Sequence, residues 1–266
     1  MTIFSFDRAI VRQPAPSVVH GLRTGDHEGP SFDGVAREHA AYVAALRRAG
    51  LEVTILPPLP ACPDSIFVED PALVFTEGAI LLRPGAPTRA NEAAALEVPL
   101  REMFDTVVWL PDGHADGGDV LVTPGKVFIG LSSRTDEAGA TALVEALAGL
   151  GRPAKIVTPP PGTLHLKSAS SLIDEETVLA TEALAATGIF AGLRVLTVPT
   201  DEQGGANVLR LNDLVLAGSA YPRTLDLLAA HGLEPVPLDV HEIAKIDAGL
   251  TCMSLRWRSP GGAQPL

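Results

Sequence analysis

Short apolar runs recur along the chain in pairs, and each pair encloses a tight turn and precedes a stretch with helical spacing. The clearest copy has apolar runs at residues 72–75 and 79–82 around the turn Thr76-Glu77-Gly78. Apolar residues spaced for one helix face follow over residues 88–104, and another apolar run lies at residues 106–109. Short runs separated by such turns are typical of strands, so the pattern predicts a β-β-α-β module.

The same module returns further along the chain. The second copy has strands at 119–122, 127–130 and 155–157 with a helix at 136–150, the third has strands at 171–173, 178–180 and 194–197 with a short helix, and the fourth has strands at 206–210, 215–217 and 234–237 with a helix at 224–231. A fifth copy is complete only if the ends of the chain meet. Residues 252–257 would then pair with residues 8–12, before a helix at 32–49 and a strand at 52–55.

Repeats of roughly 40 to 50 residues are typical of propellers and solenoids. We therefore expect an α/β fold, a five-bladed α/β propeller of pseudo-symmetric β-β-α-β modules whose ring is closed by the N- and C-terminal strands. Such closure removes exposed sheet edges. An open α/β sheet would show the same alternation and is the alternative, but hairpins rather than single strands favour the ring.

No linker divides the sequence, and residues 1–266 are expected to form a single domain. The formal net charge of −12 has no basic stretch to offset it, which argues against a nucleic-acid partner. No window approaches the roughly 18 uncharged apolar residues that cross a membrane. Two cysteines cannot form a disulfide framework, so a reducing compartment is expected. These features predict a cytoplasmic protein with no membrane and no nucleic-acid partner.

Candidate chemistry begins with Cys252, which precedes the alternating segment 253–257 and is expected at the start of a strand facing a central cavity. The other cysteine, Cys62, lies in the stiff loop Pro60-Ala61-Cys62-Pro63 and fits a packing role. A tight Pro-Pro-Gly loop leads to His165, a candidate base. A thiol and a histidine far apart in sequence are typical of a nucleophilic cysteine enzyme.

Acidic residues gather at two places. Asp64, Glu69 and Asp70 lie close together, and Asp116 and Asp119 lie on either side of two glycines. Clustered carboxylates raise one another's pKa unless a cation lies among them, so a positively charged substrate is expected. A divalent metal is the rival interpretation, but the chain has no H-x-x-H or H-E-x-x-H pattern, and no metal is predicted.

Six segments in order resemble one family. They include Asp-Ser-Ile-Phe-Val-Glu-Asp at 64–70, Asp-Gly-Gly-Asp-Val at 116–120 and Leu-His-Leu-Lys-Ser at 164–168, with further matches at 83–89, 130–135 and 250–252. Together they closely resemble dimethylarginine dimethylaminohydrolase of the guanidine-modifying superfamily over nearly the whole chain. The resemblance implies a five-bladed α/β propeller that forms one catalytic domain. It also implies hydrolysis of asymmetric dimethylarginine and monomethylarginine to L-citrulline and an amine, through a covalent cysteine S-alkylthiouronium intermediate and without a cofactor.

The resemblance also implies roles for individual residues. Cys252 would be the nucleophile, His165 the acid and base, and Asp116 the group that orients His165. For substrate binding it implies Glu69 and Asp70 at the guanidinium, Asp64 with the backbone carbonyls of Leu22 and Ile246 at the α-ammonium, and Arg89 and Arg134 at the α-carboxylate. Two arginines for one carboxylate also suit amino-acid recognition on chemical grounds, because a guanidinium offers paired donors.

Two alternatives stay open. Arginine deiminase and amidinotransferase are relatives in the same superfamily, but deiminases resemble one another in an acid two residues after the catalytic histidine, where this chain has Lys167. Fewer acceptors suit a methylated guanidinium, which has lost N–H donors. The alternative from another class is a catalytically silent ring that binds arginine-like ligands, or zinc through Cys252, His165 and Asp116. The expected partner is a small molecule, and a homodimer is left open.

Overall fold

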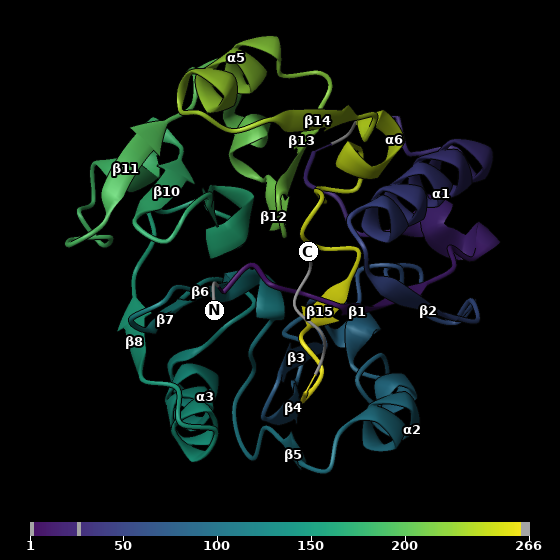
Figure 1. Cartoon of the computed structure of the whole chain (residues 1–266). Helices are drawn as coiled ribbons and strands as arrows, with labels where there is room; N and C mark the ends of the chain where they lie inside the picture. The colour runs from purple at the N-terminus through teal and green to yellow at the C-terminus, as the bar shows by residue number, and fades with distance from the viewer. Residues whose placement is uncertain (1–2, 26–27, 262–266) are drawn as a thin grey trace.

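In the computed structural model, which describes residues 3–25 and 28–261, five three-stranded sheets surround a common centre (Figure 1). In every sheet the middle strand pairs antiparallel with one neighbour and parallel with the other. A tight turn can join the antiparallel pair, whereas the parallel pair needs a longer crossover. The two connections of the module therefore follow from its strand directions.

The strands occupy three positions relative to the centre. The inner strands are β3 (Ala72–Phe75), β6 (Val120–Val122), β9 (Ser170–Leu172), β12 (Leu209–Leu211) and β15 (Leu255–Trp257). The middle strands are β1 (Arg8–Arg12), β4 (Gly78–Leu81), β7 (Val127–Gly130), β10 (Thr177–Ala180) and β13 (Leu214–Gly218). The outer strands are β2 (Glu52–Leu56), β5 (Val107–Trp109), β8 (Ala154–Val157), β11 (Arg194–Thr197) and β14 (Pro235–Leu238).

The long α-helices lie outside the sheets (Figure 1). The α-helices are α1 (Phe32–Arg48), α2 (Ala94–Met103), α3 (Glu137–Gly149), α4 (Glu182–Ala185), α5 (Pro222–Ala230) and α6 (His241–Ala244), and the 3-10 helices are η1 (Pro16–His20), η2 (Pro87–Arg89), η3 (Gly117–Asp119), η4 (Leu166–Ser168) and η5 (Gln203–Ala206). Two of the long helices begin at side-chain caps: Ser31 accepts from the Gly34 N–H, and Asp136 accepts from the Gly139 N–H. Such caps satisfy amide groups that the helix itself leaves unpaired.

The fifth sheet joins the beginning of the chain to its end. β1 pairs antiparallel with β15, with Arg8 opposite Trp257, and parallel with β2. Outside the sheet, the Ser259 N–H donates to Asp7 Oδ1 at 2.7 Å. The predicted α/β ring of five modules, closed by strands from the two ends, is confirmed.

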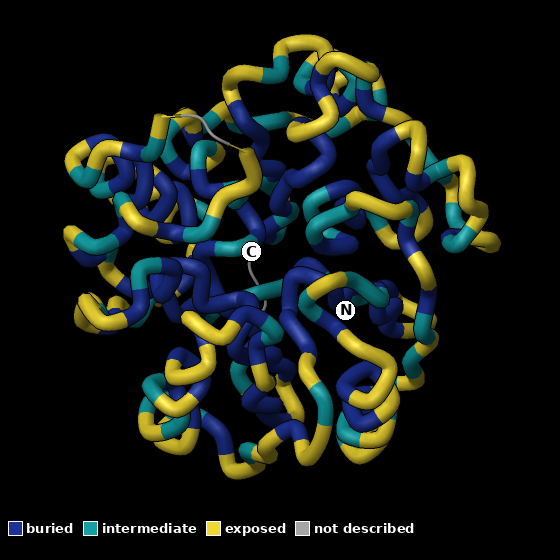
Figure 2. The backbone as a smooth tube through the Cα atoms, turned by 180° about the vertical axis from the view of Figure 1, so that it is seen from behind, coloured by how far each residue is buried: buried dark blue, intermediate teal, exposed yellow. Residues whose placement is uncertain are grey.

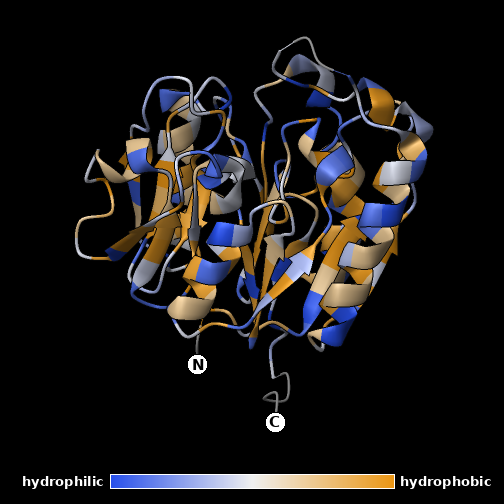
Figure 3. Ribbon diagram, turned by 90° about the horizontal axis from the view of Figure 1, so that it is seen from above, coloured by the Kyte–Doolittle hydropathy of each residue, from blue (hydrophilic) through white to orange (hydrophobic). Residues whose placement is uncertain are grey.

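Apolar side chains fill the space between each sheet and its helices. The described residues form five separate buried clusters around the ring. Figure 2 shows the buried backbone gathered toward the middle and the exposed backbone at the rim, and Figure 3 shows hydrophobic strands with polar residues on the outer helices. Over the described ranges, none of the helices is both long enough and apolar enough to traverse a bilayer.

Three predicted boundaries differ from the observed ones by more than two residues. The helix expected over 88–104 is split into η2 and α2, because Arg89 is held in a buried ion-pair cluster rather than on a helix face. The strand expected from residue 206 starts at Leu209, since Asn207 uses its side chain to bond two other loops. The strand expected from Cys252 starts at Leu255, because the Cys252 carbonyl accepts from the Glu69 amide outside the sheet.

Candidate active site

A small cavity of about 100 Å³ brings together residues from loops that are far apart in sequence. Of the ten predicted site residues, nine line it, and Glu69 is the exception. The lining residues are Leu22, Arg23, Thr24, Asp64, Phe67, Asp70, Arg89, Asp116, Arg134, Leu164, His165, Ile246, Asp247, Ala248 and Cys252. Loops carried on a rigid scaffold commonly hold functional residues, and here every loop leaves from a strand or short helix of the ring.

Cys252 lies in a turn rather than in a strand, at the segment that leads into β15. Its sulfur accepts a hydrogen bond from the Gly249 N–H at 3.4 Å. Burial, together with the carboxylates of Glu69 and Asp70, raises the pKa of the thiol to about 12. The thiol is therefore protonated at neutral pH as long as no cation enters the cavity to offset these charges.

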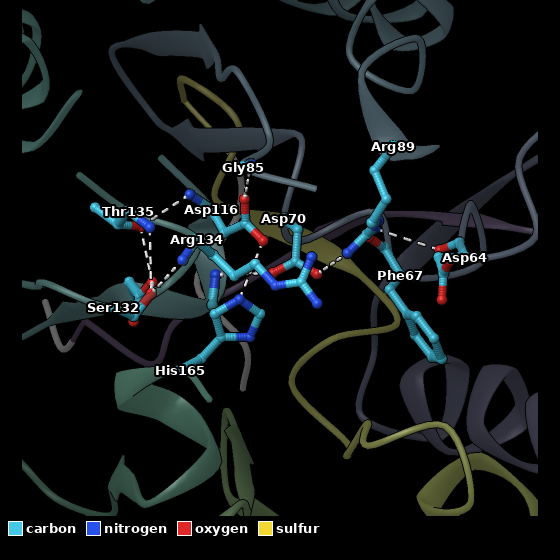
Figure 4. Close-up of polar contacts among 12 residues, drawn as sticks. Asp64, Phe67, Asp70, Gly85, Arg89, Asp116, Ser132, Arg134, Thr135 and His165 are labelled. Atoms are coloured by element: carbon cyan, nitrogen blue, oxygen red, sulfur yellow. Dashed lines mark hydrogen bonds and ion pairs between the residues drawn. The ribbon is translucent and has the colours of Figure 1, made fainter. Parts of the chain in front are cut away.

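His165 is the buried residue that precedes η4. Its Nε2 lies 3.0 Å from Asp116 Oδ2, and Asp116 Oδ1 accepts from the Gly85 N–H at 2.8 Å (Figure 4). Burial disfavours the imidazolium, but the carboxylates of Asp70, Asp116 and Asp119 outweigh it and raise the pKa of His165 to about 9. The imidazole is therefore protonated at neutral pH, as a general acid must be.

The ring of His165 lies directly against the backbone of η3. A Cβ on Gly118 would come within 2.6 Å of His165 Nδ1 and 2.8 Å of Asp70 Oδ1. The Gly118 N–H also donates to Asp70 Oδ1 at 3.0 Å. Because Gly118 has no side chain, His165 and Asp70 can both pack against the backbone of this short turn.

A buried ion-pair cluster supports the floor of the cavity. The guanidinium of Arg89 binds Asp70 and Glu92, and it also donates to the carbonyl of Phe67 at 2.9 Å. Although burial alone would raise it, the pKa of Asp70 is lowered by Arg89 and His165. Burial raises the pKa of Glu92 to about 7 despite the opposing effect of Arg89. Arg89 thus holds Asp70 in its charged form.

Arg134 approaches the cavity from the loop after β7. Among the described residues no carboxylate lies within ion-pair distance of its guanidinium, whereas Arg89 has two such partners. Figure 4 shows the Arg134 side chain beside His165 and Asp70. Of the two predicted arginines, Arg134 is therefore the one free to bind an entering carboxylate.

The opposite side of the cavity is formed by Asp64 and the loop after η1. Asp64 Oδ1 accepts from the Leu22 N–H at 2.9 Å, and burial raises the pKa of this carboxyl. The hydroxyl of Thr24 binds Asp247 Oδ1 at 3.1 Å. Loop residues on both sides of the entrance are thus joined to each other.

Glu69 lies behind the cavity instead of lining it. Its Oε1 binds Lys167 Nζ at 2.6 Å and Arg256 Nη2 at 3.2 Å, and its Oε2 accepts from the Thr251 hydroxyl at 2.9 Å. Through Thr251, and through the Glu69 amide that donates to the Cys252 carbonyl, these contacts are joined to the turn that carries Cys252. We call the three residues Glu69, Lys167 and Arg256 the ion-pair wall.

Sequence reasoning missed the residues that support the site from behind. Glu92 and Arg256 fall in segments that resemble an exposed helix face and a strand, and no local signal marks either as buried and ion-paired. Asp119 belonged to a recognised acidic cluster without a role. It accepts from the Leu166 amide and from the hydroxyls of Ser132 and Thr135, and so ties three loops together.

The grouping most compatible with a metal is Asp70, Asp116 and His165, whose ligand atoms lie within 4.8 Å of one another. A ligating histidine must be neutral, but the pKa of His165 is about 9. Asp70 is already bound to Arg89. A metal ion at this cluster would therefore have to displace the proton of His165 and compete with Arg89 for Asp70.

Comparison with known proteins first gives a class. The family model of arginine deiminase matches residues 55–203, more than half of the chain. The N-terminal domain of ArgZ, an arginine dihydrolase from Cyanobacteria, matches with a TM-score of 0.84 over 95% of this chain and 98% of that one. At 17% identity this similarity shows the fold alone. Fold and family model together define a protein of the arginine deiminase class.

More similar relatives narrow the class. The chain is 38% identical to the N(G),N(G)-dimethylarginine dimethylaminohydrolase of Streptomyces coelicolor, over 94% of this chain and 97% of the relative. It is 33% identical to that of Pseudomonas aeruginosa, over 95% and 100%. A structure of the Pseudomonas protein, a cysteine-to-serine variant complexed with citrulline, matches with a TM-score of 0.92 at 32% identity, over 95% of this chain and 100% of that one. The chain belongs to the dimethylarginine dimethylaminohydrolase family.

Proposed function

We propose that this protein hydrolyses asymmetric dimethylarginine and monomethylarginine to L-citrulline and dimethylamine or methylamine. Family membership supports the reaction, and solved relatives hold citrulline or form an adduct with S-methyl-L-thiocitrulline. One observation carries the proposal to this chain: a thiol, a protonated imidazole and buried carboxylates line the same small cavity. The whole chain, residues 1–266, would act as one catalytic domain without a cofactor.

In the proposed complex the amino-acid end of the substrate lies at the entrance. The α-carboxylate binds Arg134, whose guanidinium has no ion-pair partner within the described chain. The α-ammonium binds Asp64 with the carbonyls of Leu22 and Ile246, all of which line the cavity. Arg89 supports the site by holding Asp70, and contributes to the carboxylate only through its positive charge.

The guanidinium end lies above Cys252 with Asp70 as its counter-ion. Entry of this cation offsets the negative charges of Glu69 and Asp70, which keep the thiol protonated in the unliganded site. The pKa of Cys252 therefore falls when substrate binds, its proton passes to solvent, and the thiolate forms beside the carbon that it attacks. Because this carbon is a poor electrophile, orientation and electrostatic stabilisation supply most of the help.

The reaction then proceeds in two halves. In the first, the Cys252 sulfur bonds to the guanidinium carbon, and the methylated nitrogen departs as the amine after taking a proton from His165. The product is an S-alkylthiouronium on Cys252. In the second, water gives one proton to His165 as its oxygen attacks the same carbon. The carbon–sulfur bond then breaks, the other proton of the water passes to the departing sulfur, and citrulline and the Cys252 thiol form. Asp116 stabilises the imidazolium form of His165 through their 3.0 Å contact.

Arginine deiminase is the closest alternative, and the ion-pair wall argues against it. Glu69 is the acid with the largest electrostatic effect on Cys252, and Lys167 and Arg256 both bind it. Its acceptors are therefore occupied, which leaves few for the additional N–H groups of an unmethylated guanidinium. Unpaired buried donors are costly, so the site suits a methylated substrate.

One assay tests the proposal. The protein is incubated separately with arginine, monomethylarginine and asymmetric dimethylarginine, and citrulline and the released amine are measured. We expect equal amounts of citrulline and dimethylamine from the dimethylated substrate, unchanged by a chelator. Citrulline and ammonia from arginine alone would establish a deiminase instead. Binding without any product would establish a silent arginine-binding ring.

A further inference from the structure

A second and larger cavity occupies the centre of the ring, separate from the site proposed for the reaction. Its volume is about 450 Å³, within the range of roughly 300–1,000 Å³ that is typical of small-molecule sites. All five inner strands contribute to its walls, together with residues 3–6. Glu69, Lys167 and Arg256 line it, so the ion-pair wall separates it from the Cys252 cavity.

The walls of this central cavity are apolar and basic. Large apolar side chains from the N-terminal segment and the inner strands line it, among them Phe4, Phe6, Leu73, Phe75, Leu172 and Trp257. The lining also contains five basic residues but only two acidic ones. This excess of positive charge is unusual in a chain whose net charge is −12. The chemistry therefore favours an anion with an apolar body.

The acids of the cavity are already used. Glu77 binds Arg152 at 2.8 Å, and Glu69 binds Lys167 and Arg256. By contrast, no carboxylate in the described part of the chain lies within ion-pair distance of Arg210. An arginine is always protonated in proteins, so Arg210 is a partly buried charge without a counter-ion. Such a charge is costly unless an anion reaches it.

The contacts of Arg210 leave the Nε donor of its guanidinium without a hydrogen-bond partner among the described residues. Nη1 donates to the Ile173 carbonyl at 2.8 Å, and the guanidinium lies 5.1 Å from the centre of the Phe4 ring. Nε is buried and has no hydrogen-bond partner in the described residues. Nε and Nη2 form the side of a guanidinium that binds both oxygens of a carboxylate. The unpaired Nε thus belongs to the pair of donors, Nε and Nη2, whose geometry matches a carboxylate.

We propose that the central cavity is a binding site for an aliphatic carboxylate, with the Nε–Nη2 edge of Arg210 holding the carboxylate and the apolar walls holding the chain. The proposal is independent of the reaction at Cys252 and goes beyond it. It accounts for the cationic and apolar lining, because a cavity filled only by water would need neither property.

Trp257 provides a direct readout because it lines the cavity. The chain has two tryptophans, and the other, Trp109, is partly exposed on the outer strand β5. Replacing it (Trp109→Phe) leaves Trp257 as the sole tryptophan. Decanoate is then titrated below its micelle concentration, with decyltrimethylammonium as a probe of equal chain length and opposite charge. We expect a saturable change in Trp257 fluorescence with decanoate and a response at least tenfold weaker with the cation.

Variants in the same Trp109→Phe background locate the site. Arg210→Gln should weaken decanoate binding by about tenfold or more, because it removes a charge-assisted contact. Arg194→Gln, a change at an exposed arginine on β11, and Arg134→Ala, in the smaller cavity, should both leave decanoate binding unchanged.

Three results would overturn the proposal: equal binding of the two amphiphiles, no saturable response to decanoate, or undiminished binding to Arg210→Gln. If Arg210→Gln does not fold, the comparison of decanoate with the cation on the Trp109→Phe protein decides the question by itself. Arg210→Lys then serves as the second variant. It keeps the charge but loses the paired donors, so it should bind decanoate more weakly than the parent protein.

Discussion

The two cysteines of the chain differ in what surrounds them. Cys252 lines the cavity with His165 and Asp70, whereas Cys62 is buried in a proline-rich loop. We expect Cys252→Ser to abolish turnover, because a hydroxyl is a far weaker nucleophile than a thiolate near neutral pH. Cys62→Ser should keep most of the activity. Measuring citrulline release by both variants checks this, and an equal loss in both would mean that the nucleophile has been misplaced.

The histidine gives a prediction about stability and pH. The pKa of His165 is about 9 in the folded protein, above the unfolded value of about 6.5. The folded state therefore binds this proton more tightly, and the resulting stabilisation is complete below about pH 6.5 and lost as the pH rises through about 9. Its size is of the order of 1–3 kcal/mol. The stability difference between the protein and His165→Gln, measured by urea unfolding, should shrink from pH 6.5 to pH 9.5. A difference that does not change with pH would contradict the assignment of this pKa.

Arg134 gives a prediction about binding. A charge-assisted contact with the α-carboxylate is worth roughly 1.5–3 kcal/mol, so Arg134→Ala should raise KM by about one to two decades. The loss should be much smaller for a substrate without the carboxylate. Steady-state kinetics with dimethylarginine and its decarboxylated analogue check this, with Arg194→Ala as the control. If Arg134→Ala raises KM equally for both substrates, Arg134 does not bind the carboxylate.

Residues that face the cavity could be predicted from sequence better than residues that support it. Asp64, Asp70 and Cys252 belong to short motifs whose order resembles a family, and they do line the cavity. Glu69 belongs to the same motif but points to Lys167 and Arg256 in the ion-pair wall, because adjacent residues in an irregular turn point to different sides. Glu92 has no motif, and its burial depends on Arg89 reaching it from the neighbouring turn.

At the scale of elements, Asn207 joins three segments. Its Nδ2 donates to the Lys167 carbonyl at 2.8 Å and to the Thr251 hydroxyl at 3.1 Å, and its Oδ1 accepts from the Thr251 N–H. It thus connects η4, the Cys252 turn and the start of the fourth module. Asn207→Ala should destabilise the protein by about 2–4 kcal/mol, since each lost hydrogen bond contributes about 1 kcal/mol. Chemical unfolding measures this, and the exposed Asn91→Ala is the control. Equal stability of both variants would show that the three segments hold together without Asn207.

The limits of helices and strands could be predicted from the sequence wherever the local pattern agrees with the packing. These strands are short, mostly apolar runs between turn or loop residues, so β3, β7 and β11 were predicted at their observed limits. The prediction failed where a side chain binds across the ring. Arg89 and Asn207 both stand in segments of suitable local pattern, but their long-range hydrogen bonds keep them out of the helix or strand, which starts further along the chain.

At the scale of the whole molecule, closure of the ring predicts tolerance to circular permutation. Because β1 pairs with β15, Arg8 lies opposite Trp257, so a linker can join the described segments that precede and follow this pair. A new break between Gly125 and Lys126 falls in the exposed turn between β6 and β7, where loop entropy changes little. This permutant should fold and remain active. A break between the buried Phe128 and Ile129 should abolish folding, and circular dichroism with the citrulline assay compares the two. Failure of the first permutant would mean that closure depends on the original order of synthesis.

The pairing of β1 with β15 has a consequence for how the protein folds during its synthesis on the ribosome. β1 and β2 are made first, but their sheet is completed by β15, which is synthesised after about 250 other residues. The largest buried cluster joins residues 9–67 to residues 209–253, so it too cannot be completed until the end of the chain has been synthesised. The turn that carries Cys252 belongs to the same late segment. A nascent chain can therefore fold four of its modules before Cys252 has been synthesised. The protein becomes catalytically active only when β15 closes the ring.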